Sequence, residues 1–265
     1  MAEHKAVVRF SGTLSPLSLF QRLHGQGGAA AEKRSSAQAL AVRAQTPFEV
    51  EQMGVFAITD IDTYYQKRQS SLGRLYGLLS TLQETRPGRY LVAMPSYEYL
   101  SQLADYASSD DTFMRQTRDT NDEAQLELLA RFQSADQATL GIVMGGVFSE
   151  SIDLGAGTLS GVVVVSLGLP PPDLCKTLMQ AHFDETDGPG WGHQVAYLQP
   201  ALSRIVQAAG RLIRGPLDRG VVCLVDPRFA NPSVRDYFPA HWQVETMQAE
   251  KLKSRLKTFW LHDLA

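Results

Sequence analysis

The run "GVVVVSLGLPPP" (Gly161–Pro172) decides the fold that we expect for this chain. Its first residues are β-branched and apolar without interruption, and they do not alternate with polar residues. Such a run is typical of a strand that helices cover on both faces, because neither face of the strand meets water. The stretch therefore indicates a central strand of a parallel sheet.

Similar apolar runs alternate with amphipathic stretches along the rest of the chain. Further strands are expected at Tyr90–Ser96, Thr112–Thr117, 139–146 and Gly220–Arg228. Helices are expected at 97–107, Asn121–Gln133, Pro172–Asp184, Gln194–Arg214 and Thr246–Leu261. This alternation predicts an α/β protein with a mostly parallel sheet and helices on both faces. Ligands are then expected beyond the carboxyl ends of the strands.

The first 60 residues differ from the rest. Residues 7–16 indicate one strand and a turn, and residues 39–48 and 53–59 indicate strands of a sheet edge or connector. Gly25–Gln38 is small, polar and rich in glycine, which predicts a flexible segment. We therefore place the boundary of the compact domain at residue 48.

Composition excludes several classes of protein. The chain has 265 residues, 44% of them hydrophobic, and it can bury a core. Its net charge of −3 means that any nucleic-acid surface must be local. The two cysteines, Cys175 and Cys223, favour neither a disulfide framework nor a metal site, and they suggest a reducing cytoplasm. No run approaches the roughly 20 apolar residues of a membrane span.

Two arginines stand out in "IVQAAGRLIRGPLDRG" (Ile205–Gly220). If the helix continues to Arg214, then Gln207, Arg211 and Arg214 form one polar stripe. Gly210 inside a helix would cost about 1 kcal/mol, which suggests that something approaches the backbone there. Guanidinium groups suit bidentate contact with phosphate. A solvated or ion-paired helix face would have the same pattern, so both interpretations stay open.

Two further stretches follow strands. "MGGVFSESIDLGAGTLSG" (Met144–Gly161) contains five glycines, which let backbone N–H groups approach phosphates, together with Glu150 and Asp153. An ordinary crossover with turn glycines would look the same. "AMPSYEYL" (Ala93–Leu100) places Ser96 at the start of a helix, where it can cap the helix or line an anion site.

Together these three stretches resemble motifs IV, V and VI of superfamily 2 helicases, in the form found in DinG/YoaA-like relatives of the XPD/Rad3 helicases. "FSGTLSPLSLFQRLHG" (Phe10–Gly25) resembles motif III of the same group. Order and spacing agree over nearly the whole chain. The family usually has alanine at Gly12 and glycine at Ser151. The resemblance implies a RecA-like fold of the P-loop NTPase type.

The motifs that the sequence lacks indicate which half of a helicase motor it resembles. It contains no G-x-x-x-x-G-K-[ST] phosphate loop, and "FDETDG" (183–188) has no apolar strand before it. By resemblance, residues 1–47 are the end of a first motor domain and a connector, and residues 48–265 are the second RecA-like domain. ATP and Mg²⁺ would then be bound jointly with the first domain. An iron–sulfur cluster is expected only in that other half.

The resemblance also assigns roles to residues. The catalytic set is Arg211, Arg214 and Gln207, with the arginines on the γ-phosphate. The nucleotide-binding set is Glu150, Asp153 and Gly210. The DNA-binding set is Ser96, Tyr97 and Ser149, and the coupling set is Ser11 and Thr13. No metal ligand is expected in this chain.

The implied function is that of the C-terminal motor domain of an ATP-dependent helicase moving 5′→3′ on single-stranded DNA. Its partners would be single-stranded DNA and the N-terminal domain of the same protein, in a bacterial cytoplasm at the nucleoid. The chain alone is expected not to hydrolyse ATP. The alternative is a stand-alone module that binds nucleic acid or protein. The apolar face of "QAEKLKSRLKTFWLHDLA" (248–265) could pack on the sheet or dock a repair or replication protein.

Overall fold

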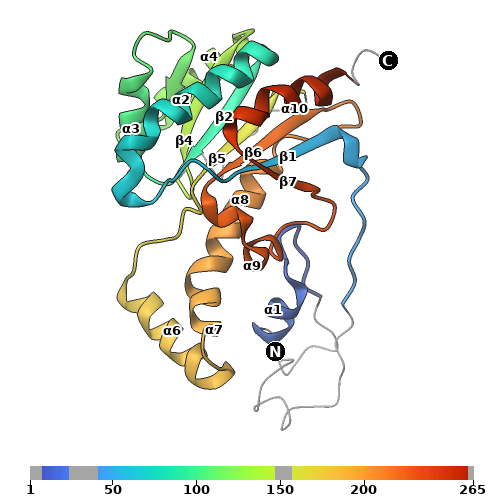
Figure 1. Cartoon of the computed structure of the whole chain (residues 1–265). Helices are drawn as coiled ribbons and strands as arrows, with labels where there is room; N and C mark the ends of the chain where they lie inside the picture. Colours follow the sequence, from blue (N-terminus) through green and yellow to red (C-terminus); the bar gives the residue numbers. More distant parts are fainter. Residues whose placement is uncertain (1–7, 24–40, 147–156, 262–265) are drawn as a thin grey trace.

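A seven-stranded sheet with only parallel pairings organises the protein (Figure 1). The computed structural model describes residues 8–23, 41–146 and 157–261. The strand order is β3-β4-β2-β5-β6-β1-β7. The strands are β1 (Met53–Ile58), β2 (Arg89–Met94), β3 (Phe113–Arg115), β4 (Ala138–Val143), β5 (Gly161–Val165), β6 (Gly220–Val225) and β7 (Val244–Met247). The parallel sheet predicted from the apolar runs is confirmed.

Helices cover both faces of this sheet, and each face has its own core. One face packs against α1 (Leu17–Gln21), α4 (Asp122–Ser134), α8 (Gln199–Ala209) and α9 (Pro232–Arg235). The other packs against α2 (Arg68–Thr85), α3 (Tyr97–Tyr106) and α10 (Ala249–Leu261). Successive residues of a strand alternate between the cores, so that Val222 belongs to the first and Val221 and Cys223 to the second. This explains why the strands carry no polar face.

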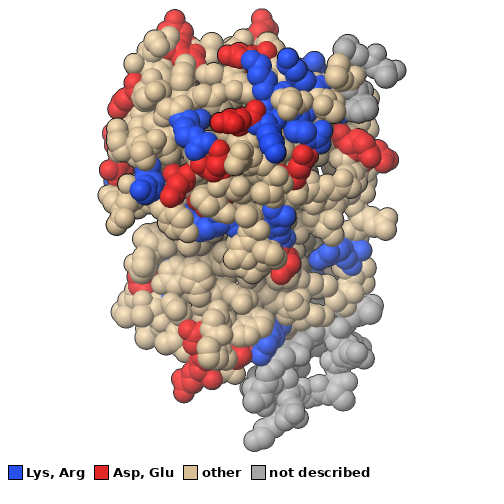
Figure 2. Space-filling view, viewed as in Figure 1, with Lys and Arg blue, Asp and Glu red and all other residues tan. Residues whose placement is uncertain are grey.

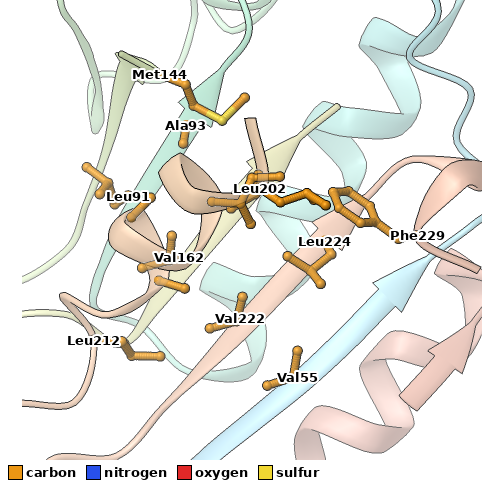
Figure 3. Packing of buried hydrophobic residues seen from close by; sticks show 14 of the residues in the cluster. Val55, Leu91, Ala93, Met144, Val162, Leu202, Leu212, Val222, Leu224 and Phe229 are labelled. Atoms are coloured by element: carbon orange, nitrogen blue, oxygen red, sulfur yellow. The ribbon is translucent and has the colours of Figure 1, made fainter. Parts of the chain in front are cut away.

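Helix α8 lies across the middle of the first face (Figure 3). Its residue Leu202 is fully buried in the same cluster as Val162 and Val222 of the central strands. Leu212, just after the helix, is also buried there. An added Cβ on Gly220 would lie 2.5 Å from a Leu212 methyl carbon and 2.9 Å from the backbone oxygen of Ser160, so the first residue of β6 favours glycine. The core therefore fixes the segment that leads from α8 into β6.

Several predicted elements are wrong. Residues 8–15 and 41–46 form no strand, and β1 lies between β6 and β7 rather than at an edge. Residues Val244–Met247 form strand β7, so the last helix begins at Ala249 and not at Thr246. The sequence does not predict β7, because polar residues interrupt its apolar pattern. The edge of a sheet tolerates such residues.

Helix α2 was not predicted at all, although its leucines show helical spacing. Leu72, Leu75, Leu79 and Leu82 are all buried in the second core. Two glycines lower the helix propensity of this segment. Gly73 has a packing reason, because a Cβ there would lie 3.0 Å from the Tyr106 hydroxyl. Tertiary packing therefore outweighs local propensity in this helix.

The C-terminal helix α10 packs its apolar face on the sheet. Leu252 and Leu256 are fully buried and Trp260 is 8% exposed. The opposite face is basic, and Figure 2 shows Lys and Arg side chains gathering over this helix. Lys253 pairs with Glu84 at 2.8 Å, and Arg255 pairs with Glu245 at 2.7 Å. The apolar face is thus used for packing within the chain.

Helices α6 (Leu174–Asp187) and α7 (Trp191–His193) project away from the sheet (Figure 1). No residue of α6 is buried. Within "FDETDG", Asp184 accepts hydrogen bonds from the backbone N–H groups of Gly190 and Gly192, both at 2.9 Å. That carboxylate joins the two helices, and residues 183–187 lie inside α6 rather than directly after a strand. Among the described residues, no helix is long and apolar enough to span a bilayer.

Candidate functional site

The two arginines lie on a loop and not on a helix. Helix α8 ends at Ala209, and Gly210 forms its C-cap with an α-helical backbone at φ −63°. The polar stripe predicted for a helix continuing to Arg214 is therefore wrong, and Gly210 is not in a helix interior. Gly210 and the nine residues that follow it lead into β6 at Gly220. We call residues 210–219 the arginine loop.

The predicted residues nevertheless meet in one open groove of about 780 Å³. Gln207, Gly210, Arg211 and Arg214 line it together with Thr13. The remaining lining residues are Gly12, Val206, Pro239, His241 and Trp242. The segment that resembles motif III thus lies beside the segment that resembles motif VI.

Ser11 is close to this groove but does not line it. Its hydroxyl lies 3.1 Å from the Thr13 hydroxyl and accepts the Thr13 backbone N–H at 3.2 Å. Ser11 therefore shapes the turn that carries Thr13. A Cβ on Gly12 would have nothing within 4 Å, so the alanine usual in the family would fit here. The departure at Gly12 does not alter the packing of the groove.

The groove lies at the amino ends of the strands, contrary to the expectation of a site at the carboxyl ends. Arg211 and Arg214 precede β6, and His241 and Trp242 precede β7. The general rule for open α/β sheets therefore fails for the arginines.

Two guanidinium groups line the groove, and groups of this kind can bind phosphate. The Arg211 side chain is largely buried, with 8% of the residue exposed, whereas Arg214 is exposed. A guanidinium fixed by its surroundings loses less entropy when it binds an anion, and its forked donors match phosphate oxygens. Partial burial lowers the pKa of His241, which favours the neutral ring and limits the positive charge at the rim.

His241 and Trp242 were not predicted as groove residues. Trp242 packs against Phe238, with ring centroids 5.1 Å apart. Nothing in the local sequence pattern marks these two residues, because they come from the loop before the edge strand β7. Their place in the groove depends on the pairing of β7 with β1. Only the folded chain brings them to the arginine loop.

Ser96 and Tyr97 lie at the opposite ends of the strands, just after β2. Ser96 caps α3, since its hydroxyl accepts the Tyr99 backbone N–H at 3.3 Å. An Arg68 Nη1 donates to the same hydroxyl at 3.5 Å, which brings a cation to the helix start. The Tyr97 hydroxyl accepts a hydrogen bond from Gln116 Nε2 at 3.0 Å. Both predicted residues are partly exposed, and a cation lies beside them.

Three predicted site residues, Ser149, Glu150 and Asp153, lie outside the described residues, as does Ser151. Among the described residues, no group of three or more His, Cys, Asp or Glu side chains could hold a metal ion. The geometry therefore provides two separate places. One is an arginine groove at the amino ends of the strands, and the other is a polar surface at the carboxyl end of β2.

Comparison with known proteins identifies the family. Residues 79–245 match the model of the helicase C-terminal domain. The chain belongs to this family. The match covers β2 to the first residues of β7 and includes the whole arginine loop.

The relatives of this helicase C-terminal domain are XPD-related enzymes. It is 27% identical over 175 residues to the ATP-dependent DNA helicase XPD of Sulfolobus acidocaldarius, a match that covers 64% of this chain and 30% of the relative. It is 29% identical over 159 residues to the ATP-dependent DNA helicase YoaA of Escherichia coli, which covers 60% of this chain and 24% of that protein. The chain spans less than a third of the length of either relative.

Solved structures agree on the fold. An XPD helicase aligns with a TM-score of 0.66 and 22% identity, covering 89% of this chain and 42% of that one. The C-terminal domain of the DEAD-box protein Dbp5 aligns with a TM-score of 0.50 and 13% identity, covering 79% and 99%. The predicted RecA-like α/β fold is confirmed. The domain boundary placed at residue 48 stays a prediction.

Proposed function

We propose that this chain is the second motor domain of an ATP-dependent DNA helicase and that it presents Arg211 and Arg214 to the γ-phosphate of ATP. The observation that carries the proposal is the groove in which both arginines and Gln207 meet Thr13. The family and the printed activities of the relatives support it. The guanidinium groups would stabilise the charge that develops on the transferred phosphoryl group.

The other half of the ATP site would come from a first motor domain. That domain would supply the phosphate loop and the Mg²⁺ ligands, and any iron–sulfur cluster would lie there. The position of the groove at the open amino ends of β6 and β7 suits such a shared site. This division predicts that the chain alone hydrolyses essentially no ATP. DNA-stimulated turnover by the chain alone would contradict it.

We place the DNA contacts at Ser96 and Tyr97, because the adjacent Arg68 guanidinium and the start of α3 favour phosphate. The DNA surface and the arginine groove then lie at opposite ends of the strands. ATP-driven changes at one end would be passed through the sheet to the other. Movement 5′→3′ and a cytoplasmic, nucleoid-associated location stay predictions from the resemblance.

The test uses a protein that joins this chain to its ATP-binding motor domain. Arg211→Ala should lower DNA-stimulated turnover by about 10³-fold or more while affinity for single-stranded DNA stays within about twofold. Arg255→Ala is a matched control, because that arginine pairs with Glu245 at the surface. Normal turnover combined with loss of DNA binding in Arg211→Ala would reverse the role assignment.

A further inference from the structure

The residues just before β1 are hydrogen-bonded to the arginine loop. Gln52, the last residue before β1, donates from its Nε2 to the carbonyl oxygen of Asp218 at 2.7 Å. The same nitrogen lies 3.2 Å from each of the carbonyl oxygens of Gly215 and Pro216. Its Oε1 accepts the Glu49 backbone N–H at 2.9 Å, which fixes the orientation of the amide. One side chain therefore links the arginine loop to residues 48–52, which lead from the predicted connector into β1 and which we call the lead-in.

Asp218 holds the same loop from inside. Its Oδ2 accepts the backbone N–H groups of Arg214 at 2.7 Å and of Gly215 at 2.8 Å. Only 8% of Asp218 is exposed, so these charge-assisted bonds are shielded from water. The backbone at Arg214 is thus tied to Asp218, and the carbonyl of Asp218 is tied to Gln52.

Apolar contacts repeat this link on a second side of the loop. A small cavity of about 200 Å³ is lined by the lead-in and by the arginine loop. Phe48 and Val50 come from the lead-in, and Gly210 and Ile213 come from the loop. The lead-in and the arginine loop therefore meet through a polar clamp and an apolar cavity. These contacts join parts of the chain more than 150 residues apart.

We propose that Gln52 and Asp218 are positioning residues that set the place of Arg211 and Arg214 according to the position of the connector. The inference rests on the proposed function and on the predicted boundary, by which residues 1–47 are the end of the first motor domain and the connector that precedes the lead-in. Movement between the two motor domains would pull on residues 41–49, and Gln52 would pass that movement to the loop carbonyls. The arginines would then be in register with phosphate only when the connector is in place.

The experiment compares variants of this chain by three measurements. Gln52→Met keeps the volume of the side chain but removes its hydrogen bonds. The matched control is Gln137→Met, at an exposed glutamine with no role in the clamp. The measurements are hydrogen exchange at the Arg214 and Gly215 amides, the affinity for tripolyphosphate followed by arginine Nε–Hε signals, and the melting temperature.

A second pair of variants separates positioning from folding. Both Asp218 bonds end on one oxygen, so Asp218→Asn can keep them, whereas Asp218→Ala loses them. We expect Gln52→Met and Asp218→Ala to speed exchange at the two amides. We expect both to weaken tripolyphosphate binding about tenfold, equivalent to about 1.4 kcal/mol. Asp218→Asn should restore most of the affinity.

The outcomes are distinguishable. Unchanged amide exchange and unchanged affinity in Gln52→Met would overturn the positioning role. The same loss of affinity in Gln137→Met would also overturn it. If the unmodified chain does not bind tripolyphosphate, or if Arg211→Ala binds it equally well, the proposed phosphate role of the groove fails. Amide exchange in Gln52→Met would still decide whether the clamp holds the loop.

Discussion

A buried ion pair at the carboxyl end of β6 makes a quantitative prediction. Asp226 is fully buried, and its carboxylate accepts hydrogen bonds from Arg228 Nε and Nη2, both at 2.7 Å. The Thr63 hydroxyl donates to the same carboxylate. Burial works against the Arg228 charge, but the bonds and charge of Asp226 outweigh it, and the pKa of Arg228 is raised. The guanidinium also stacks on Tyr64, 4.4 Å from the ring centroid.

Arg228→Met should remove the cation and leave the Asp226 carboxylate without it in the core. Breaking a buried pair in this way costs about 3–5 kcal/mol of unfolding free energy. A domain of this size loses about 2–4 °C in melting temperature per kcal/mol, so we expect a fall of about 6–20 °C. The side chain of Arg228 is 24% exposed, which places the loss toward the lower end.

The assay is equilibrium urea unfolding followed by circular dichroism. Arg255→Met is the matched control, because its pair with Glu245 has both side chains 43% exposed and should contribute less than about 1 kcal/mol. The double variant Asp226→Asn, Arg228→Met removes the uncompensated charge and should recover part of the loss. If Arg228→Met loses no more unfolding free energy than Arg255→Met, the pairing of the buried Asp226 carboxylate does not stabilise the carboxyl end of β6.

Two further predictions concern α10 and the groove. Trp260→Ala should destabilise the domain by about 3–5 kcal/mol, because Trp260 is 8% exposed and packs in the second core. A Trp260→Ala variant that keeps its urea midpoint but loses a protein partner would indicate that α10 is a docking site instead. Burial lowers the pKa of His241 below its ordinary value of 6.5, so the unfolded chain binds this proton more readily and stability falls as pH drops through that value. Lowering the pH from about 7.5 to about 5.5 should therefore reduce the unfolding free energy of the unmodified chain more than that of His241→Gln. Parallel profiles of unfolding free energy against pH would refute this.

Local patterns were sufficient where burial alone decides the structure. The uninterrupted apolar runs of β2, β4, β5 and β6 predicted strands covered on both faces, and the alternation of their side chains between two cores explains why. The same pattern failed for β7, an edge strand in which no more than Met247 is buried. It failed for α2 as well, because two glycines lower the helix propensity of a segment that tertiary packing stabilises as a helix.

The candidate site was predictable in composition but not in geometry. Gln207, Arg211 and Arg214 line one groove, yet the helix predicted to carry them ends at Ala209. Sequence periodicity could not show this, because Leu212, just after the helix, is buried in the same core as α8. No sequence pattern marks Gln52 as a partner of the arginine loop, because it bonds to backbone carbonyl groups that are distant in the sequence.

The place of β1 in the sheet has a consequence for how the domain is made. Met53 pairs with Gly220, and Val55 pairs with Val244, so the first strand of this sheet in chain order has both neighbours more than 160 residues later in the sequence. Until those partners emerge, both edges of β1 expose unpaired backbone groups. Completion of the sheet must therefore wait until β6 and β7 have been synthesised. A nascent chain stalled before β6 should expose both edges of β1 and bind chaperones that recognise extended segments.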